Sequence, residues 1–401
     1  MRRIELNWIY RVLMILMIGG LIACSPEENG GEVPPPDKVD EGYFIEVTKT
    51  ETLNKASLAG KLGLESTNPL LLILPEKQVK TEAIRYVSKD PAGKPLEVSG
   101  LITYPAEGAC RGVVIGPHFT IGADRESPSA VMATVESMLA LYGYAVAVPD
   151  YIGFGATVDL PQTYIHAESA GQVSCDLFFA TREYLSLIKR PVERDAYVVG
   201  YSQGGYAALA FQQMAEQQYA DKIKILRAFA GGGPYLPESI FDHFMQQDEV
   251  ANPATILLTI VGADYADRLN LDYTKIFLEP VLSSYREWCV SKKYTLGEIN
   301  HLLPSNRLSD WLHPDFFTDN HNEEIRKLKG SLTKNNLIDW VPRAPILLAH
   351  GTKDETVPFS NTQAAYDAFQ QAGASVELHT SKFDHTSAAI PFYLLVLQAL
   401  K

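Results

Sequence analysis

The sequence is poor in cysteine and in the residue spacings that bind metals. Only four cysteines occur among 401 residues, and no two of them form a C-x-x-C pair. None of the nine histidines belongs to an H-E-x-x-H pattern, the spacing that places two zinc ligands on one helix face. These absences argue against a metal mechanism, and we expect the chain to need no metal and no cofactor.

Basic residues are fewer than acidic residues in this chain. The chain carries 35 Lys and Arg against 48 Asp and Glu, a formal net charge of −13. Such a surface repels phosphate backbones, so nucleic acid is not an expected partner.

The N-terminal apolar run is too short for a comfortable membrane span. It extends from Val12 to Ile22 and follows Arg2, Arg3 and Arg11, an arrangement typical of a secretory signal. We therefore interpret residues 1–23 as a signal peptide, with an uncleaved anchor as the alternative.

The end of that run resembles a bacterial lipobox. The stretch Leu21-Ile22-Ala23-Cys24 implies cleavage before Cys24 and lipidation of that residue. Residues 24–42 have the proline-containing, polar composition of a flexible tether. The expected location is the bacterial cell envelope, lipid-anchored in the outer membrane, and Glu27 and Glu28 resemble an export signal for surface exposure.

Three cysteines remain once Cys24 is lipidated. Cys110, Cys175 and Cys289 are an odd number, so at most one disulfide can form within the chain. None has a neighbouring partner in the sequence, and we interpret all three as buried thiols.

The most informative stretch is G-x-S-x-G at residues 200–204. It follows the extended run Tyr197 to Val199 and precedes a helical pattern that begins at Ala207. A nucleophile elbow needs this strand-turn-helix context, with residues that lack bulk two positions before and after the serine. Ser202 is therefore the candidate nucleophile, whereas the pentapeptide alone would also fit a glycine-rich turn.

A serine nucleophile needs a base, and the base needs an acid that orients it. Asp354 follows a buried-strand pattern that ends at Gly351, and His385 follows a short strand pattern from Val376 to His379. Positions just after successive parallel strands share the carboxyl edge of a sheet. We therefore expect Ser202, Asp354 and His385 to converge on one site.

Other residues compete for these roles. His379 precedes the last loop and is the alternative base, whereas His350 ends a strand, where histidine more often packs than titrates. Asp384 is the rival acid, but neighbours in sequence rarely point at each other's rings, so Asp354 has the better position.

Strand and helix patterns alternate along most of the chain. About a hundred residues between Pro234 and Pro345 interrupt the alternation, too many for a loop. We assign residues 234–341 to an inserted helical cap and residues 43–233 and 342–401 to the catalytic domain, with a peripheral packing subdomain as the alternative. The expected core segments are a hairpin over Ala83–Tyr104 and then Val113–Ile115, Ala130–Tyr142, Ala145–Val148, Ala167–Ile188, Tyr197–Val199, Gln203–Gln217 and Ile225–Ala230.

From about Ile84 to its end, the chain resembles the α/β-hydrolase-fold serine esterases, close to their secreted lipase and esterase branch. The resemblance implies an α/β fold with a doubly wound, mostly parallel sheet and an inserted cap. It also implies that Ser202, Asp354 and His385 form the triad. The matching stretches are Gly200–Gly205, His350–Pro358 and Asp384-His385, with support from Pro149–Gly155 and Tyr164–Ser169.

The expected oxyanion loop departs from the family pattern. Related esterases carry His-Gly-Thr after the third core strand, whereas this chain has Pro117-His118-Phe119-Thr120. The first oxyanion donor is expected to be the backbone N–H of Gln203. We assign the second donor to Thr120, with Phe119 as the alternative, and interpret His118 as a scaffold residue.

These patterns predict a serine hydrolase that cleaves carboxylic esters through an acyl-enzyme. Candidate substrates are acetyl or feruloyl esters of polysaccharide and short-chain lipids, and Trp311 and Phe316 are expected to wall the substrate crevice. A serine peptidase of the same fold is the alternative, and a non-catalytic binding lipoprotein is the third hypothesis. The sequence gives no prediction of oligomeric state.

Overall fold

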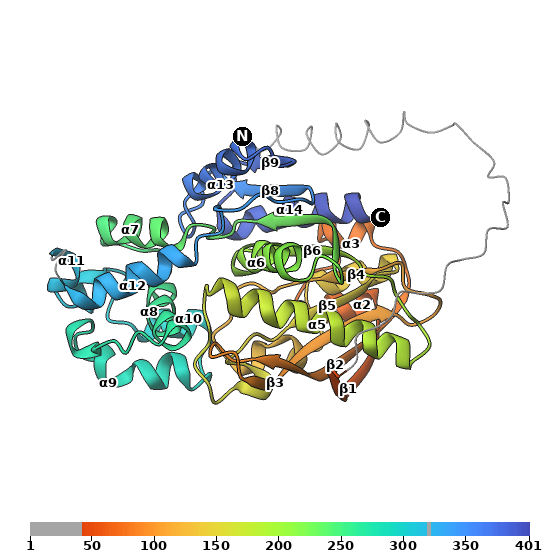
Figure 1. Ribbon diagram of the computed structural model, residues 1–401, viewed down its shortest axis with the longest axis horizontal. Coiled ribbons are helices and arrows are strands. Elements are labelled where there is room, and N and C mark those ends of the chain that lie inside the picture. The colour runs from red at the N-terminus through yellow and green to blue at the C-terminus, as the bar shows by residue number, and fades with distance from the viewer. Residues whose placement is uncertain (1–41, 319–321) are drawn as a thin grey trace. The chain divides into compact units, whose positions relative to one another are not determined.

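A nine-stranded sheet forms the centre of the protein (Figure 1). The computed structural model describes residues 42–318 and 322–401. The strand order is β1-β2-β3-β5-β4-β6-β7-β8-β9; neighbours from β1 to β5 in this order pair antiparallel, and those from β5 to β9 pair parallel. The strands are β1 (Phe44–Asn54), β2 (Gln78–Lys89), β3 (Pro95–Pro105), β4 (Val113–Ile115), β5 (Ala145–Pro149), β6 (Asp195–Tyr201), β7 (Lys224–Gly231), β8 (Ile346–Gly351) and β9 (Val376–Ser381).

The predicted hairpin is confirmed in β2 and β3, which pair antiparallel from Val79 opposite Pro105 to Lys89 opposite Pro95. The Asp90 side chain accepts the backbone N–H groups of Ala92 and Lys94, both at 2.8 Å. An aspartate that caps its own turn in this way favours the reversal that the sequence predicts.

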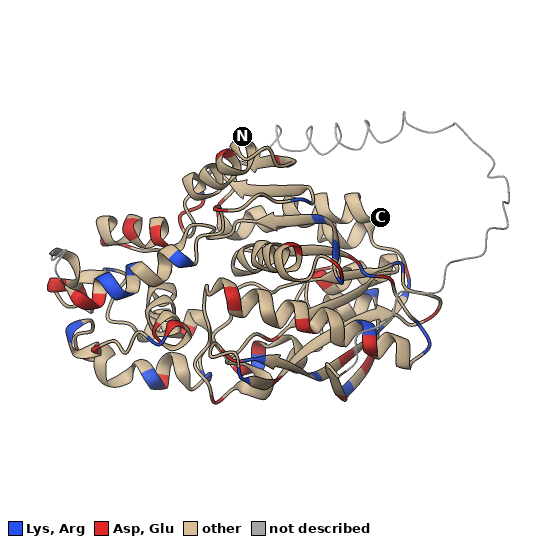
Figure 2. Cartoon of the chain, viewed as in Figure 1, with Lys and Arg blue, Asp and Glu red and all other residues tan. Residues whose placement is uncertain are grey.

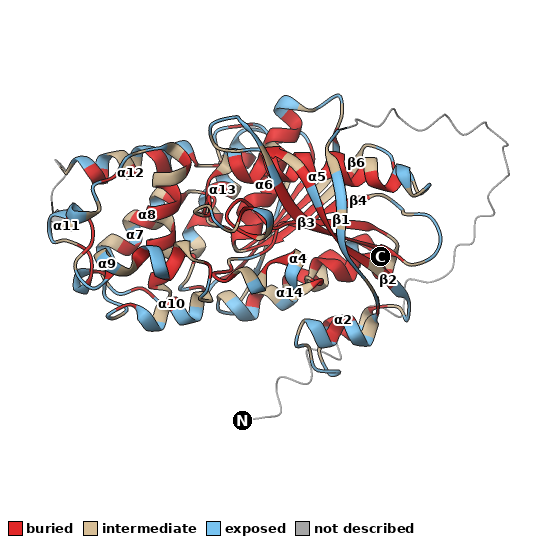
Figure 3. Ribbon diagram, turned by 90° about the horizontal axis from the view of Figure 1, so that it is seen from below, coloured by how far each residue is buried: buried red, intermediate tan, exposed pale blue. Residues whose placement is uncertain are grey.

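Helices cover both faces of the sheet, so the predicted doubly wound architecture is confirmed. Side chains on β4 alternate between the two faces: Val113 and Ile115 join one hydrophobic core, and Val114 joins the other. Figure 3 shows the buried strands between α5 and α6 on one side and α4 and α14 on the other. The helices of the α/β core are α2 (Lys55–Lys61), α3 (Pro69–Ile73), α4 (Pro128–Val131), α5 (Ala167–Leu187), α6 (Gln203–Gln218), α13 (Phe359–Gln371) and α14 (His385–Leu400), with 3₁₀ turns at Asp124–Glu126, Glu136–Tyr142 and Gly155–Thr157.

The expectation of one helix over Ala130–Tyr142 is wrong. Helix α4 ends at Val131, because Met132 adopts a left-handed φ of 65° and its N–H closes onto the carbonyl of Pro128. The apolar residues that follow reach the sheet from the 3₁₀ turn Glu136–Tyr142 instead.

The residues between β7 and β8 are mainly helical, and Figures 1 and 3 show their helices grouped beside the sheet. They bury side chains of their own, including Leu257, Phe277 and Leu328. The helices are α7 (Pro237–Gln247), α8 (Pro253–Asp267), α9 (Val281–Tyr285), α10 (Leu296–Leu302), α11 (Asp315–Thr318) and α12 (Glu323–Lys334), with short turns at Tyr273–Lys275, Arg286–Val290 and Leu308–Asp310.

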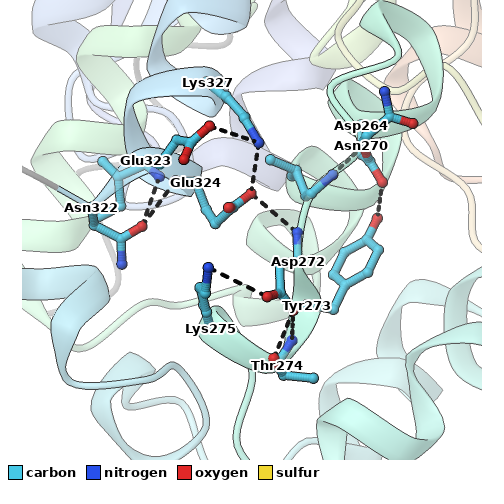
Figure 4. Close-up of polar contacts among 12 residues, drawn as sticks. Asp264, Asn270, Asp272, Tyr273, Thr274, Lys275, Asn322, Glu323, Glu324 and Lys327 are labelled. Atoms are coloured by element: carbon cyan, nitrogen blue, oxygen red, sulfur yellow. Dashed lines mark hydrogen bonds and ion pairs between the residues drawn. The ribbon is translucent and has the colours of Figure 1, made fainter.

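Polar contacts tie the turn between α8 and α9 to two helices of this insertion (Figure 4). Asp264 on α8 accepts the hydroxyl of Tyr273 at 2.7 Å. Glu324 on α12 accepts the N–H of Asp272 at 3.1 Å and pairs with Lys327 at 3.5 Å. These contacts join α8 and α12 to one loop of the insertion.

Charged residues of both signs are interspersed on the insertion helices (Figure 2). Cys110, Cys175 and Cys289 are free thiols; the last two are buried and Cys110 is half-buried. Within residues 42–318 and 322–401, no helix has the length and apolar character needed to cross a bilayer. The predicted signal peptide, the Cys24 lipidation site and nearly all of the predicted tether lie outside the described residues.

Candidate active site

The turn between β6 and α6 has the geometry of a nucleophile elbow. Ser202 sits at φ 60° and ψ −124°, a conformation that costs a non-glycine residue about 1–3 kcal/mol. A Cβ added to Gly200 would lie 2.0 Å from the carbonyl oxygen of Gly204. A Cβ on Gly204 would lie 2.1 Å from the carbonyl oxygen of Pro117. The two glycines therefore permit both the sharp turn and the close approach of the loop after β4.

The structure brings Ser202, His385 and Asp354 together at the carboxyl edge of the sheet. His385, the first residue of α14, places Nε2 2.8 Å from Ser202 Oγ and Nδ1 2.6 Å from Asp354 Oδ2. The rival residues lie elsewhere: half-buried His379 on β9 contacts Glu377, and Asp384 caps α14 by accepting the N–H of Ser387.

Asp354 is buried and surrounded by donors. Its Oδ1 accepts the N–H groups of Thr356 at 2.9 Å and Val357 at 2.8 Å. Its Oδ2 contacts His385, and also His350 Nε2 at 3.1 Å. Burial by itself raises the pKa of Asp354, but the hydrogen bonds from His350 and His385 outweigh it and lower the pKa to about 2. The carboxylate is therefore ionised wherever a histidine base can work.

His350 is a second histidine partner of Asp354 that sequence reasoning missed. Its Nε2 also lies 2.8 Å from the carbonyl oxygen of Val357, and its Nδ1 lies 2.7 Å from the hydroxyl of Thr362. A carbonyl oxygen can only accept, so His350 Nε2 must carry the hydrogen that the Val357 carbonyl accepts. That N–H also donates toward Asp354 Oδ2. The one sequence feature that could have indicated this contact is the spacing of four residues between His350, at the end of a strand, and Asp354.

A mainly apolar pocket of about 400 Å³ opens onto the Ser202 hydroxyl. This volume lies in the range of small-molecule sites. The core contributes one wall, and the insertion contributes the opposite wall from α7, α8 and α10. The lining residues are Phe119, Thr120, Tyr164, Ile165, Tyr201, Ser202, Gln203, Pro234, Pro237, Ile240, Phe241, Phe244, Asn252, Thr255, Ile256, Thr259, Leu296, Thr356, Val357, His385, Thr386 and Ala389.

A sequence model of the secretory lipase family matches residues 128–266 and 279–391, which include the elbow, most of the insertion, and Ser202, Asp354 and His385. The chain belongs to the secretory lipase family.

Individual relatives of this family member are distant. A secreted triacylglycerol lipase of Malassezia globosa is 25% identical over 276 residues, covering 64% of this chain and 54% of that protein. A second, from Malassezia furfur, is 24% identical over 245 residues, 58% of each chain. The chain thus spans about half the length of the curated relatives it matches.

Solved structures show the same fold. The rice cell wall degrading esterase LipA from Xanthomonas oryzae aligns with a TM-score of 0.73 at 21% identity, covering 88% of this chain and 96% of that one. Candida antarctica lipase A in its closed state aligns with a TM-score of 0.66 at 15% identity, covering 89% and 83%. Together with the observed sheet, these similarities establish the α/β-hydrolase fold for this secretory lipase family member.

The structure corrects the placement of Trp311 and Phe316 in this family member. Neither lines the pocket: Trp311 is 0% exposed and Phe316 2% exposed. Trp311 packs near Phe277, and Phe316 packs edge-on against Phe241, with ring centroids 6.1 Å apart. These two aromatics fill the core of the insertion instead, because helices that extend beside a sheet need apolar residues between them. Phe241 is the pocket residue that Phe316 supports.

The three candidate oxyanion residues all line the pocket beside Ser202. Gln203 is the first residue of α6, where a backbone N–H has no partner within the helix. Among the described residues, no hydrogen bond uses the N–H of Phe119, Thr120 or Gln203. Each of these N–H groups therefore has no protein acceptor among the described residues.

Proposed function

We propose that the protein hydrolyses carboxylic esters through an acyl-enzyme on Ser202. The observation that carries this proposal is the position of His385, which contacts both Ser202 and Asp354 at an apolar pocket. Membership in the secretory lipase family supports it. A non-catalytic binding role gives no reason for an ionised carboxylate, an imidazole and a serine in this order.

The reaction follows from the geometry. Ser202 Oγ attacks the ester carbonyl and gives its proton to His385 Nε2, while Asp354 stabilises the imidazolium. Backbone N–H groups of Gln203 and Thr120 hold the oxyanion. Collapse of the tetrahedral intermediate breaks the bond between the acyl carbon and the alcohol oxygen, and the alcohol leaves with the proton from His385. Water then attacks the acyl-enzyme, gives a proton to His385, and releases the acid and Ser202.

The apolar lining of the pocket favours esters with an apolar acyl group. Ile240 and Phe244 on α7 and Ile256 on α8 face the same cavity as Ser202, and burial of apolar atoms contributes about 25 cal/mol per Å². Short-chain lipids, or acetyl and feruloyl esters of polysaccharide, are the substrates we propose. The relatives support this range by name, since they include triacylglycerol lipases and a cell wall degrading esterase.

A panel of substrates tests the proposal. We expect p-nitrophenyl esters from acetate to palmitate and methyl ferulate to be hydrolysed with a clear optimum of acyl group, and aminoacyl anilides to be hydrolysed far more slowly. Faster cleavage of the anilides would show a serine peptidase, the alternative with the same triad. Absence of cleavage across the whole panel would contradict the proposed function.

A bulky residue on α7 should change acyl preference. Ile240→Trp should fill part of the pocket and lower kcat/KM for octanoate relative to acetate by roughly ten- to two-hundredfold, the range expected for lost apolar contacts. Met245→Trp is the control, because Met245 lies on the same helix outside the pocket lining. Equal changes with both esters in Ile240→Trp would mean that this wall does not contact the acyl chain.

The pH profile should report the histidine base. Because Asp354 has a pKa of about 2, its ionisation contributes nothing to the profile above about pH 4. The rate should therefore rise with pH as the histidine base loses its proton. Measurement of kcat/KM from pH 5 to 9 on one ester checks this, and a flat profile would contradict a histidine base.

We also propose that the protein acts at the bacterial cell envelope, held by a lipid on Cys24. The support is the sequence Leu21-Ile22-Ala23-Cys24 after an apolar run. In membrane fractionation, Cys24→Ser should lose lipid attachment; a variant that stays firmly in the membrane would indicate an uncleaved anchor instead.

A further inference from the structure

Two aromatic side chains, those of His118 and Tyr151, bond to backbone carbonyl groups of the loop after β4. His118 is buried, and its Nδ1 lies 2.6 Å from the carbonyl oxygen of Phe119. The hydroxyl of Tyr151 donates to the carbonyl oxygen of His118 at 3.1 Å. The two rings also pack together, with centroids 4.4 Å apart. Two consecutive carbonyl groups of this loop are thus fixed by side chains.

The His118 ring has only one proton to donate. Burial lowers its pKa to about 4, so the imidazole is neutral at working pH. Its Nε2 lies 3.4 Å from the carbonyl oxygen of Asp150, a longer contact than that of Nδ1. The proton therefore belongs on Nδ1, where it makes the short hydrogen bond to Phe119.

We call the His118 and Tyr151 side chains the clamp of this loop. The residues beside the clamp are themselves held in place. Asp150 is fully buried and accepts the hydroxyls of Ser99 at 2.6 Å and Ser129 at 2.5 Å. Tyr151 follows it with a left-handed φ of 63°. The stretch Pro149–Gly155, which the sequence singled out without a role, thus supports the loop that faces Ser202.

The carbonyl of Phe119 and the N–H of Thr120 belong to one peptide group. That group is planar and trans, so its oxygen and its hydrogen point to opposite sides. A hydrogen bond that draws the oxygen toward buried His118 directs the N–H of Thr120 away from the core. Thr120 lines the pocket with Ser202, so this side is the one on which an oxyanion would form.

We propose that His118 and Tyr151 are positioning residues, which orient the Phe119–Thr120 peptide so that the N–H of Thr120 binds the oxyanion. The inference rests on the proposed ester hydrolysis. It also accounts for the missing glycine at position 119, because Phe119 does not adopt a positive φ. Because the clamp fixes the Phe119–Thr120 peptide, position 119 needs no glycine and can keep an ordinary backbone conformation.

Matched substitutions at His118 test the inference. His118→Leu removes the donor and should lower kcat about 10²- to 10³-fold, the loss typical of one oxyanion donor, with little change in KM. His118→Asn places an amide N–H near the position of Nδ1 and should restore kcat to within about tenfold of wild type. His118→Gln extends its amide toward the position of Nε2 and should not rescue. Tyr151→Phe, which keeps the ring, should lower kcat about two- to tenfold.

The outcomes separate this inference from the proposed function. A wild-type enzyme that turns over, combined with equal kcat in the Leu and Asn variants, would overturn the clamp and leave ester hydrolysis standing. A change confined to KM would overturn it too. Affinity for a boronic acid, which forms a tetrahedral adduct on Ser202, should fall in parallel with kcat across the variants. If the wild type hydrolyses no ester, the function and the clamp both fail.

Discussion

Ser202→Ala should lower kcat by at least about 10⁴-fold while the melting temperature stays within a few degrees of wild type. The substitution removes only the hydroxyl, which bonds to His385 at 2.8 Å. His385→Ala should cause a loss of similar size, and the double variant should be no slower than either single one, because triad residues act as a unit. Single-turnover kinetics on one p-nitrophenyl ester measures all three.

His379→Ala is the matched control for the base. His379 follows β8 and the acid in sequence as His385 does, but it is half-buried on β9 and lies beside Glu377. We expect activity within about twofold of wild type, since surface substitutions away from a site rarely matter. Loss of activity in His379→Ala together with an active His385→Ala would reverse the assignment.

Asp354→Asn should lower kcat by about 10³- to 10⁴-fold, because an amide no longer fixes the tautomer of His385 or stabilises its charge. Asp384→Asn is the control, as Asp384 caps α14 through Ser387 and asparagine caps helices equally well. Its activity should stay within about threefold of wild type. Equal losses in the two variants would mean that they act on the fold of the loop rather than on the base.

Asp354→Asn should also change how the stability of the fold depends on pH. The pKa of Asp354 is lowered from 3.8 to about 2 by its donors. A lowered pKa in the folded state means that ionisation stabilises the fold above about pH 4, and that this stabilisation is lost as pH falls toward 2. Wild type should therefore lose more stability than Asp354→Asn between pH 5 and 2, measured by urea unfolding.

The convergence of Ser202, Asp354 and His385 could be predicted because its signals are local. The glycines around Ser202 specify a turn, and the positions of Asp354 and His385 after strand patterns place them at one sheet edge whatever the rest of the chain does. The strands themselves followed from short β-branched runs such as Val113–Ile115, which parallel pairing buries on both faces.

The pocket could not be predicted, because its walls depend on how the insertion helices pack. Trp311 and Phe316 were expected to wall the substrate crevice, but they are buried inside the insertion. The contact of His350 with Asp354 depends on a side-chain orientation that a strand pattern does not specify. The contacts of His118 likewise depend on Tyr151, which lies in the loop that follows strand β5.

Labelling with a fluorophosphonate, followed by peptide mass spectrometry, tests the central claim most directly. The probe forms a stable phosphonyl ester only with an activated serine, so it reports on the nucleophile without any assumption about substrate. We predict a single adduct on the peptide that contains Ser202, no adduct in Ser202→Ala, and labelling slowed by orders of magnitude in His385→Ala. An adduct on another serine, or ester hydrolysis by a protein that the probe does not label, would contradict the account.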